Sequence, residues 1–259
     1  VQILLEHGAT QTINQMDRIG THPMHWACQD AYPKILELLC KAKADVENKN
    51  GKGGSPLLLA LTYEEDRKDV KLECVRILIE HKVDVNAIDP RDGESPLGFV
   101  SKKGSIEAAA LLLKAGATAT IGRMDHRGAH PMSWAAQEAN PPLLKLLIEA
   151  KANVEQPNGK GGTPLMLATC DPGPRNVECL RMLLKAKADP NQLDHDGDPV
   201  LIRSMIRDDA AQSAALLEAG ARANATDHHG ISLVQRFGAL AQSKMLRLLI
   251  QHGADVSGV

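Results

Sequence analysis

Short apolar runs recur along the chain with a helical spacing. In residues 35–39 (ILELL) and 143–148 (LLKLLI) the apolar side chains are three and four positions apart, which places them on one face of a helix. Each run lies between a Pro-containing motif and a short tail such as residues 114–117 (KAGA). The pattern predicts a series of short helices whose leucine-rich faces form the core.

The chain also contains an internal duplication. Residues 125–135 (DHRGAHPMSWA) nearly repeat residues 17–27 (DRIGTHPMHWA), 108 positions earlier. Inside each copy a shorter unit runs from Asp or Asn through Gly to Ser, Thr or His, and then to Pro and an apolar residue, as in 50–57 (NGKGGSPL) and 158–165 (NGKGGTPL). After a partial unit at 1–16, full units begin near positions 17, 50, 89, 125, 158, 194 and 227, so that 17–124 and 125–226 are duplicated blocks of three units.

These units resemble the ankyrin repeat, which has about 33 residues and consists of a turn and two helices around a T-P-L-H-x-A core. The resemblance implies an all-α repeat solenoid of helix-turn-helix units with β-turn fingers, forming a single ankyrin-repeat domain over residues 1–259. Residues 1–9 resemble the second helix of a repeat whose first helix lies upstream, so we expect a longer chain or a larger complex. The motif weakens from Asp194 onward, where Pro is displaced or missing and Phe237 replaces a small Ala.

Two of the longer intervals between units predict surface insertions, because repeats tolerate added residues where a loop is exposed. The first insertion covers residues 61–70, and its counterpart covers residues 169–176. We expect both to be loops between the two helices of a repeat.

The residue before the motif Pro is predicted to cap the first helix. Ser55, Ser95 and Thr163 carry a hydroxyl that can accept a backbone N–H, while Pro occupies the first helical position without losing a hydrogen bond. His22 and His130 replace the hydroxyl. A neutral imidazole can accept the same bond, so these two caps are expected to weaken in acid.

The turn after each second helix contains one of two residue types. Gly, which suits the left-handed conformation that ends a helix, occurs at Gly8, Gly116, Gly220 and Gly253. Lys replaces it at Lys43, Lys82, Lys151 and Lys187. We interpret these lysines as tolerated backbone strain, partly offset by a cation near a helix C-terminus. The alternative is that they form a docking feature.

Composition narrows the function classes. The five cysteines form an odd set without a CxxC pair, which favours a reducing intracellular compartment, cytoplasmic or nuclear. A net charge of −2 argues against general attraction to nucleic acid or to a membrane surface. No apolar run approaches the ~18 residues of a membrane-spanning helix.

The sequence offers no set of residues for catalysis, a cofactor or a metal. The Gly-rich stretch 50–55 lacks the order of a phosphate-binding loop. His22 and His25, and the neighbouring His228 and His229, are not part of a zinc-ligand spacing, and the resemblance implies a hydrogen-bonding structural role for His25. Acidic clusters lie in predicted loops or helix ends, where a solvated surface is expected. We therefore expect a protein that is not an enzyme and binds no cofactor or metal.

The resemblance implies a protein–protein interaction module. Such a module acts as a scaffold or adaptor, or as a structural subunit of a larger assembly. The alternative is the substrate-recruiting region of an enzyme whose catalytic domain lies outside this sequence. The partner is expected to be another protein, with no nucleic acid and no membrane insertion.

The resemblance also implies where the partner binds, namely along the concave surface formed by the finger tips and the exposed ends of the first helices. The finger tips carry a row of cations, with Asp92 as the only acid among the tip residues: Arg18, Lys52, Arg91, Arg127 and Lys160, with Ile19 beside the first. The ends of the first helices carry a mixed surface: Gln29, Asp30, Tyr63, Lys102, Lys103, Gln137 and Glu138. Tyr63 is a candidate apolar anchor. The cationic row predicts an acidic, extended partner segment.

Overall fold

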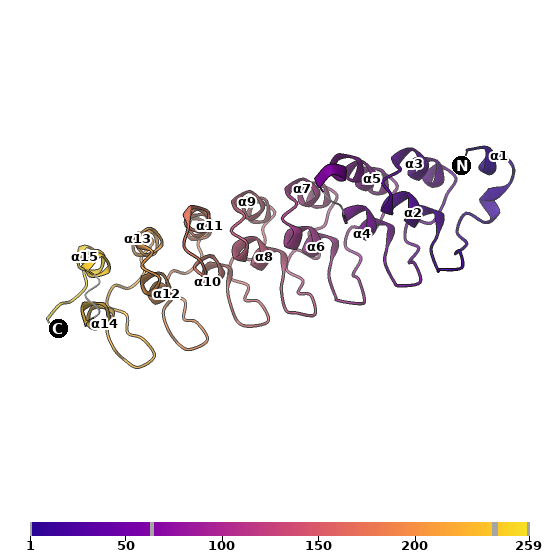
Figure 1. Ribbon diagram of the computed structural model, residues 1–259. Coiled ribbons are helices and arrows are strands. Elements are labelled where there is room, and N and C mark those ends of the chain that lie inside the picture. Colours follow the sequence, from indigo (N-terminus) through magenta and orange to yellow (C-terminus); the bar gives the residue numbers. More distant parts are fainter. Residues whose placement is uncertain (1, 63–64, 240–242, 258–259) are drawn as a thin grey trace. The chain divides into compact units, whose positions relative to one another are not determined.

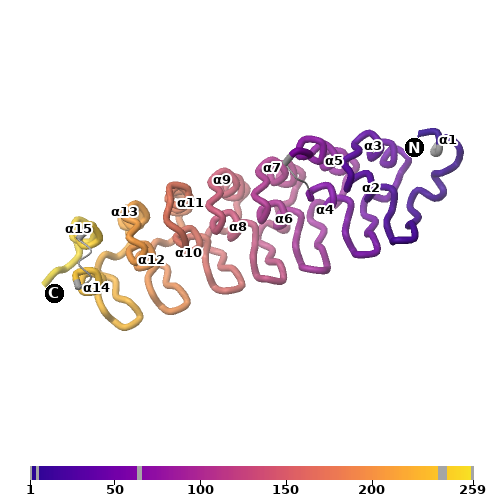
Figure 2. The backbone as a smooth tube through the Cα atoms, viewed as in Figure 1, coloured from indigo at the N-terminus to yellow at the C-terminus, as the bar shows by residue number. Residues whose placement is uncertain are grey.

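The computed structural model of the protein describes residues 2–62, 65–239 and 243–257. Within these residues it contains short helices joined by turns, isolated β-bridges and no strand, which confirms the predicted all-α architecture (Figure 1). The chain divides into two compact units, Val1–Arg127 and Gly128–Val259, called the first and the second unit here. Along each unit the chain passes from a finger to a first helix, to a second helix and on to the next finger (Figure 2).

The first unit contains three helix pairs after a short N-terminal segment. The N-terminal segment comprises α1 (Gln2–Glu6) and the 3-10 helix η1 (Ala9–Gln11). The pairs are α2 (Pro23–Gln29) with α3 (Pro33–Lys41), α4 (Pro56–Leu61) with α5 (Lys68–Glu80), and α6 (Pro96–Lys103) with α7 (Ile106–Lys114); the 3-10 helix η2 (Glu65–Arg67) precedes α5.

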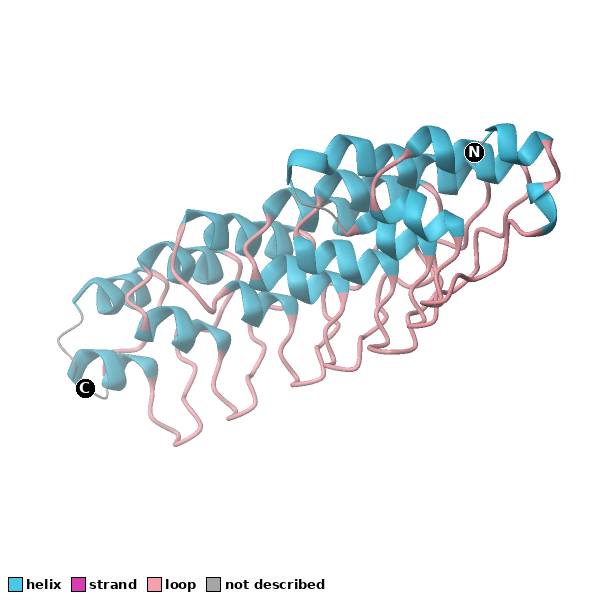
Figure 3. Ribbon diagram, turned by 45° about the vertical axis from the view of Figure 1, so that its right-hand side comes forward, coloured by secondary structure: helices cyan, strands magenta, loops and turns pink. Residues whose placement is uncertain are grey.

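The second unit contains four pairs. They are α8 (Pro131–Gln137) with α9 (Pro141–Glu149), α10 (Pro164–Ala168) with α11 (Pro174–Lys185), α12 (Val200–Ile206) with α13 (Ala210–Glu218), and α14 (Leu233–Ala239) with α15 (Ser243–Gln251). Within each unit the fingers are loops that project from the same side of the first helices (Figure 3). The leucine-rich runs are core as predicted, since Leu36, Leu143 and Leu147 are fully buried.

The prediction of loops at the two insertions is only partly correct. Leu61 ends α4 and Thr62 caps it, residues 63 and 64 lie outside the described residues, and η2 and the first turn of α5 contain residues 65–70. In the counterpart, α11 already begins at Pro174. The added residues lengthen the second helix in both places, because α5 has 13 residues and α11 has 12, compared with nine in α3.

Three predicted hydroxyl caps are confirmed. The side chains of Ser55, Ser95 and Thr163 accept the backbone N–H three residues later, at 3.3, 3.0 and 3.4 Å. Each is followed by Pro at the first helical position.

Of the two predicted imidazole caps, one is confirmed and one is wrong. His130 Nδ1 accepts the N–H of Ser133 at 3.3 Å, and His130 Nε2 donates to the carbonyl of Gln156 at 3.1 Å. The His22 side chain makes no capping bond. Its ring instead stacks on the ring of His25, with centroids 5.2 Å apart, so its orientation serves that contact rather than the helix end.

Adjacent fingers approach so closely that glycine is required at their contact. The Gly159 N–H donates to the Gly128 carbonyl at 2.7 Å, and the Gly51 N–H donates to the Gly20 carbonyl at 2.6 Å. A Cβ atom on Gly128 would lie 2.5 Å from the Gly159 Cα, which is closer than such atoms approach. The paired glycines allow neighbouring fingers to bond through their backbones.

The four lysine turns are left-handed, as predicted, with φ values of 62, 65, 65 and 73° at Lys43, Lys82, Lys151 and Lys187. At the equivalent place Gly220 has φ 97°. An L-residue with a Cβ pays about 1–2 kcal/mol for this conformation.

We expect Lys151→Gly to raise the free energy of unfolding, because Gly removes this strain. Gly also makes the unfolded chain more flexible, so the net gain should stay below about 1 kcal/mol. The reciprocal variant Gly220→Lys, where a Cβ meets open space, should lower stability by a similar amount. Urea unfolding midpoints measure both. Equal midpoints for Lys151→Gly and the parent would show that the turn stores no such strain.

Acid should weaken the His130 cap. Burial lowers the pKa of His130 below its usual value, since the buried imidazole is held neutral. The unfolded chain therefore takes up a proton near the ordinary histidine pKa of about 6.5 while the folded chain does not. The contribution of this cap to stability is complete above that pH and is lost as the pH falls toward the lowered pKa.

We expect His130→Thr, which keeps a neutral cap, to lose less stability than the parent between about pH 7.5 and about pH 5. The difference should be on the order of 1 kcal/mol, the typical contribution of a helix cap. Urea titrations at both pH values measure it, and His195→Thr, at an exposed finger-tip histidine, is the control. Parallel pH profiles for His130→Thr and the parent would contradict the expectation.

Candidate functional site

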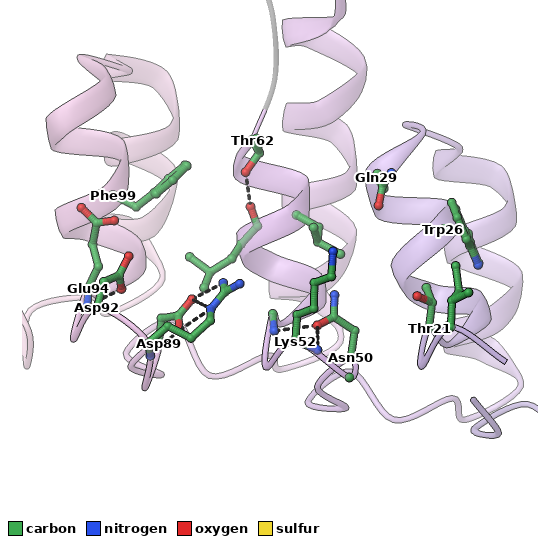
Figure 4. A pocket seen from close by; sticks show the side chains of 16 residues that line it. Thr21, Trp26, Gln29, Asn50, Lys52, Thr62, Asp89, Asp92, Glu94 and Phe99 are labelled. Atoms are coloured by element: carbon green, nitrogen blue, oxygen red, sulfur yellow. Dashed lines mark hydrogen bonds and ion pairs between the residues drawn. The ribbon is translucent and has the colours of Figure 1, made fainter. Parts of the chain in front are cut away.

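A groove of about 730 Å³ opens in the first unit between the fingers and the first helices of three successive repeats. Figure 4 shows its lining side chains, which come from α2, α4, α6 and the fingers that precede them. The fingers form one wall and the first helices form the floor. The groove therefore extends over the part of each repeat that the sequence predicted to bind a partner.

The floor is formed by one large apolar side chain from the same position of each first helix. Trp26, Leu59 and Phe99 all stand four residues after the cap residue. The residues two and five positions after the cap, such as Met24 and Ala27, face the core, so a residue at the fourth position faces away from the core. Trp26 is 39% exposed, and Leu59 and Phe99 are partly exposed.

Sequence reasoning missed these three floor residues. The sequence did contain a signal for two of them: Trp26 and Phe99 are aromatic residues that lie outside the core-facing apolar stripe of their helices. In the structure Trp26 is also held in place, because its Nε1–H donates to the Asp17 carboxylate at 3.1 Å. The indole is thereby fixed at one end of the groove (Figure 4).

The wall contains an ion pair at its centre. Arg91 Nε donates to both carboxylate oxygens of Asp89, at 2.9 and 3.1 Å. This bonding is the main reason why the pKa of Asp89 is held below its usual value. The Arg91 charge is therefore compensated inside the finger, although the sequence places it in a row of available cations.

The third finger adds two carboxylates. Asp92 Oδ1 accepts the backbone N–H of Glu94 at 3.0 Å. Burial raises the pKa of Glu94. The ammonium of Lys102, with Nζ 3.4 Å from the Glu94 carboxylate, lowers this pKa and so offsets part of the effect of burial. Lys102, predicted as a partner contact, thus forms an ion pair with a residue of its own repeat.

A buried lysine holds the floor helices in place. Lys71 of α5 donates from Nζ to the carbonyls of Cys28 at 2.7 Å and Leu59 at 2.9 Å, which belong to α2 and α4. Its burial lowers the pKa of the amine. These two bonds satisfy carbonyls near the ends of both helices and fix the spacing of the groove floor.

Four of the predicted partner residues line the groove together: Ile19, Gln29, Lys52 and Arg91. Ile19 is 68% exposed, and Arg18 beside it is exposed at the tip of the first finger. The Asp30 carbonyl accepts a bond from Arg67 Nη1 at 3.5 Å. Lys103 Nζ lies 6.0 Å from the centroid of the Phe99 ring.

The other predicted partner residues lie elsewhere. Tyr63 is outside the residues that the structure describes. Arg127 is exposed at the end of the first unit. Gln137 and Glu138, at the end of α8, and Lys160, on a finger, are exposed residues of the second unit.

The titratable side chains have structural roles. His25 Nε2 donates to the Gly54 carbonyl at 3.1 Å, which confirms the predicted hydrogen-bonding role. Burial raises the pKa of Cys40 and of Cys74 to about 11, so both thiols stay protonated and unreactive. Over the described part of the chain no three His, Cys, Asp or Glu residues are grouped so as to hold a metal ion. None of the helices there has the length and apolar character needed to cross a membrane.

Three models of the ankyrin-repeat family match the chain. They are described as ankyrin repeats in three copies over residues 117–194, ankyrin repeats in many copies over residues 67–113, and a single ankyrin repeat over residues 20–51. Together they include more than half of the chain and parts of both units.

Relatives and solved structures agree with these matches. The ankyrin repeat protein nuc-2 of Neurospora crassa is 29% identical over 203 residues, 76% of this chain and 18% of that protein. The mouse B-cell lymphoma 3 protein homolog is 28% identical over 172 residues, 65% of this chain and 36% of that protein. The crystal structure of an ankyrin repeat domain from Acinetobacter baumannii superposes with a TM-score of 0.70 and 25% identity, covering 77% of this chain and 98% of that one.

The chain thus spans about a fifth and about a third of the two relatives. The repeated motif, the helix pairs and the matching models lead to one conclusion. This chain belongs to the ankyrin-repeat family, whose repeats are protein–protein interaction modules.

Proposed function

We propose that this chain is the partner-binding module of a scaffold, an adaptor or a larger assembly, and that the groove of the first unit holds an extended segment of the partner. The observation that carries the proposal is the floor of Trp26, Leu59 and Phe99. Large side chains of this kind in a concave site contribute most of the binding energy at protein interfaces. All three side chains keep surface exposed to the groove, and none is among the buried core residues of its repeat.

The dimensions support an extended segment. Stacked helices of neighbouring repeats lie about 10 Å apart, so three repeats present about 20 Å of groove. An extended chain advances about 3.3 Å per residue and crosses this distance with about six residues. One apolar partner side chain can then pack between each pair of neighbouring floor residues.

The charges of the first two fingers support an acidic portion of the partner. Arg18 and Lys52 are exposed at successive tips, about 10 Å apart, which is close to the screening length at physiological salt. They act together on a ligand in the groove, whereas Arg91 is compensated by Asp89. Arg127 and Lys160 are further exposed cations at finger tips, which we propose as separate contacts to acidic partner residues.

Five unbridged cysteines support an intracellular location, in the cytoplasm or nucleus, as part of the proposal. The free thiols are Cys28, Cys40, Cys74, Cys170 and Cys179. Disulfides are rare in reducing compartments and common in secreted proteins.

We expect Trp26→Ala to weaken partner binding by about tenfold or more, because truncating a central aromatic anchor removes most of its contact area. The partner segment is first identified with photo-crosslinking residues placed separately at position 59 and, as a control, at position 70, in affinity isolation from the native source. Its affinity for the parent and for the variant is then measured by titration calorimetry.

Two further variants serve as controls. Trp26→Phe keeps an aromatic ring but removes the N–H bond to Asp17, so it separates ring contact from the loss of that bond and should weaken binding less than Trp26→Ala. Val70→Ala changes an exposed residue on the second helix α5 of the same unit and should leave the affinity unchanged. Unchanged binding by Trp26→Ala, with crosslinks found only from position 70, would place the partner outside the groove.

A further inference from the structure

We propose that the segment bound in the first unit carries opposite charges on either side of an apolar residue. An acidic residue contacts Lys52, and a basic residue about three positions away contacts Asp92, since adjacent repeats are about 10 Å apart and an extended chain rises about 3.3 Å per residue. The inference rests on the proposed function of the groove and specifies the chemistry of its occupant.

Lys52 and Asp92 are the uncompensated charges among the described residues that line the groove. Lys52 uses only its backbone N–H in the finger, which donates to Asn50 at 3.0 Å, and its ammonium forms no ion pair with a described residue. The Asp92 carboxylate accepts the N–H of Glu94 and forms no ion pair with a described residue either. Both side chains are exposed.

The remaining charges of the lining cancel within their own repeat. Asp89 is bonded to Arg91, and Glu94 is bonded to Lys102. The first of these pairs lies between Lys52 and Asp92 (Figure 4). The charge along the wall therefore changes from positive at the second finger, through a neutral pair, to negative at the third finger.

Nearby cations do not reverse the sign at the third finger. Lys102 is bound to Glu94. Lys103 ends α6, seven residues after Pro96, and its ammonium lies over the groove floor, 6.0 Å from the centroid of the Phe99 ring, rather than beside Asp92 on the finger. Asp92 therefore makes the charge of the wall negative at the third finger, and a basic partner residue complements this charge.

The apolar floor fixes what lies between the two charges. Leu59, which belongs to the same repeat as Lys52, stands between Trp26 and Phe99 in the order of the repeats. Phe99 belongs to the next repeat, as does Asp92, so an apolar partner residue packed between Leu59 and Phe99 has the acidic residue on one side and the basic residue on the other. A segment that is acidic throughout would bring a carboxylate against Asp92, and like charges in apposition select against such a partner.

The test uses synthetic peptides of about ten residues with the same apolar residues and the same number of charges, binding to the full chain. One peptide is acidic only, one is basic only, and two carry an acid and a base three positions apart in opposite orders. Fluorescence anisotropy gives their dissociation constants. We expect a mixed peptide to bind about fivefold tighter than the acidic one.

Two isosteric variants assign the charges. Asp92→Asn keeps the acceptor for the Glu94 N–H and should abolish the advantage of the mixed peptide, while leaving the acidic peptide as tight or tighter. Lys52→Gln should weaken the mixed and the acidic peptides alike. Lys185→Gln, at the end of α11, and Asp196→Asn, on a finger, remove the same charges from exposed residues of the second unit and should change the affinity of neither peptide.

The outcomes separate this inference from the proposed function. If the acidic peptide binds as tightly as the mixed ones and Asp92→Asn has no effect, the mixed-charge inference is overturned. Binding that is still weakened by Trp26→Ala would then keep the groove as the site. If no peptide shows binding that depends on Trp26, both the inference and the proposed function of the groove are overturned.

Discussion

The arrangement of the repeats depends on hydrogen bonds from the backbone of one repeat to a side chain of the repeat before it. Asn14 accepts the Asp45 N–H at 2.9 Å, Glu47 accepts the Asp84 N–H, and Asn224 accepts the Asp255 N–H at 2.7 Å. The accepting residue is Asn or Glu, but the donor is the same backbone position of the following repeat. Because these bonds are directional, they and the backbone bonds between fingers fix the register of neighbouring repeats, which nondirectional burial leaves open.

The groove is a consequence of this register. Trp26, Leu59 and Phe99 belong to three separate helices and form one floor only because neighbouring repeats do not slide past each other. Lys71 adds a second constraint by bonding to two of those helices from α5. The backbone bond between Gly20 and Gly51 holds the first two fingers together. A binding surface is thereby assembled from short helices of six to eight residues, none of which would be stable in isolation.

The sequence predicted the architecture because the repeat motif specifies local conformation. Ser55 and Thr163 cap helices, and Lys151 adopts a left-handed turn, since each role depends on a few neighbouring residues. The site was less accessible to prediction. The sequence motif does not determine how a side chain is oriented. His22 stacks on His25 where a cap was predicted, and Arg91 bonds to Asp89, two residues away, where a free cation was predicted. The floor residues were missed because the partner site was predicted from the charges at the finger tips. Large apolar residues outside the core-facing stripe of a helix, such as Trp26, were not considered as partner contacts.

The central claim is that the partner lies on the first helices and fingers of the first unit, and hydrogen–deuterium exchange of the full chain with and without the bound partner segment tests it most directly. The account predicts slower exchange in α2, α4, α6 and the fingers that precede them. It also predicts unchanged exchange in α3, α5 and α7, which are on the opposite side of each repeat. Protection confined to those second helices, or found only in the second unit, would contradict the account.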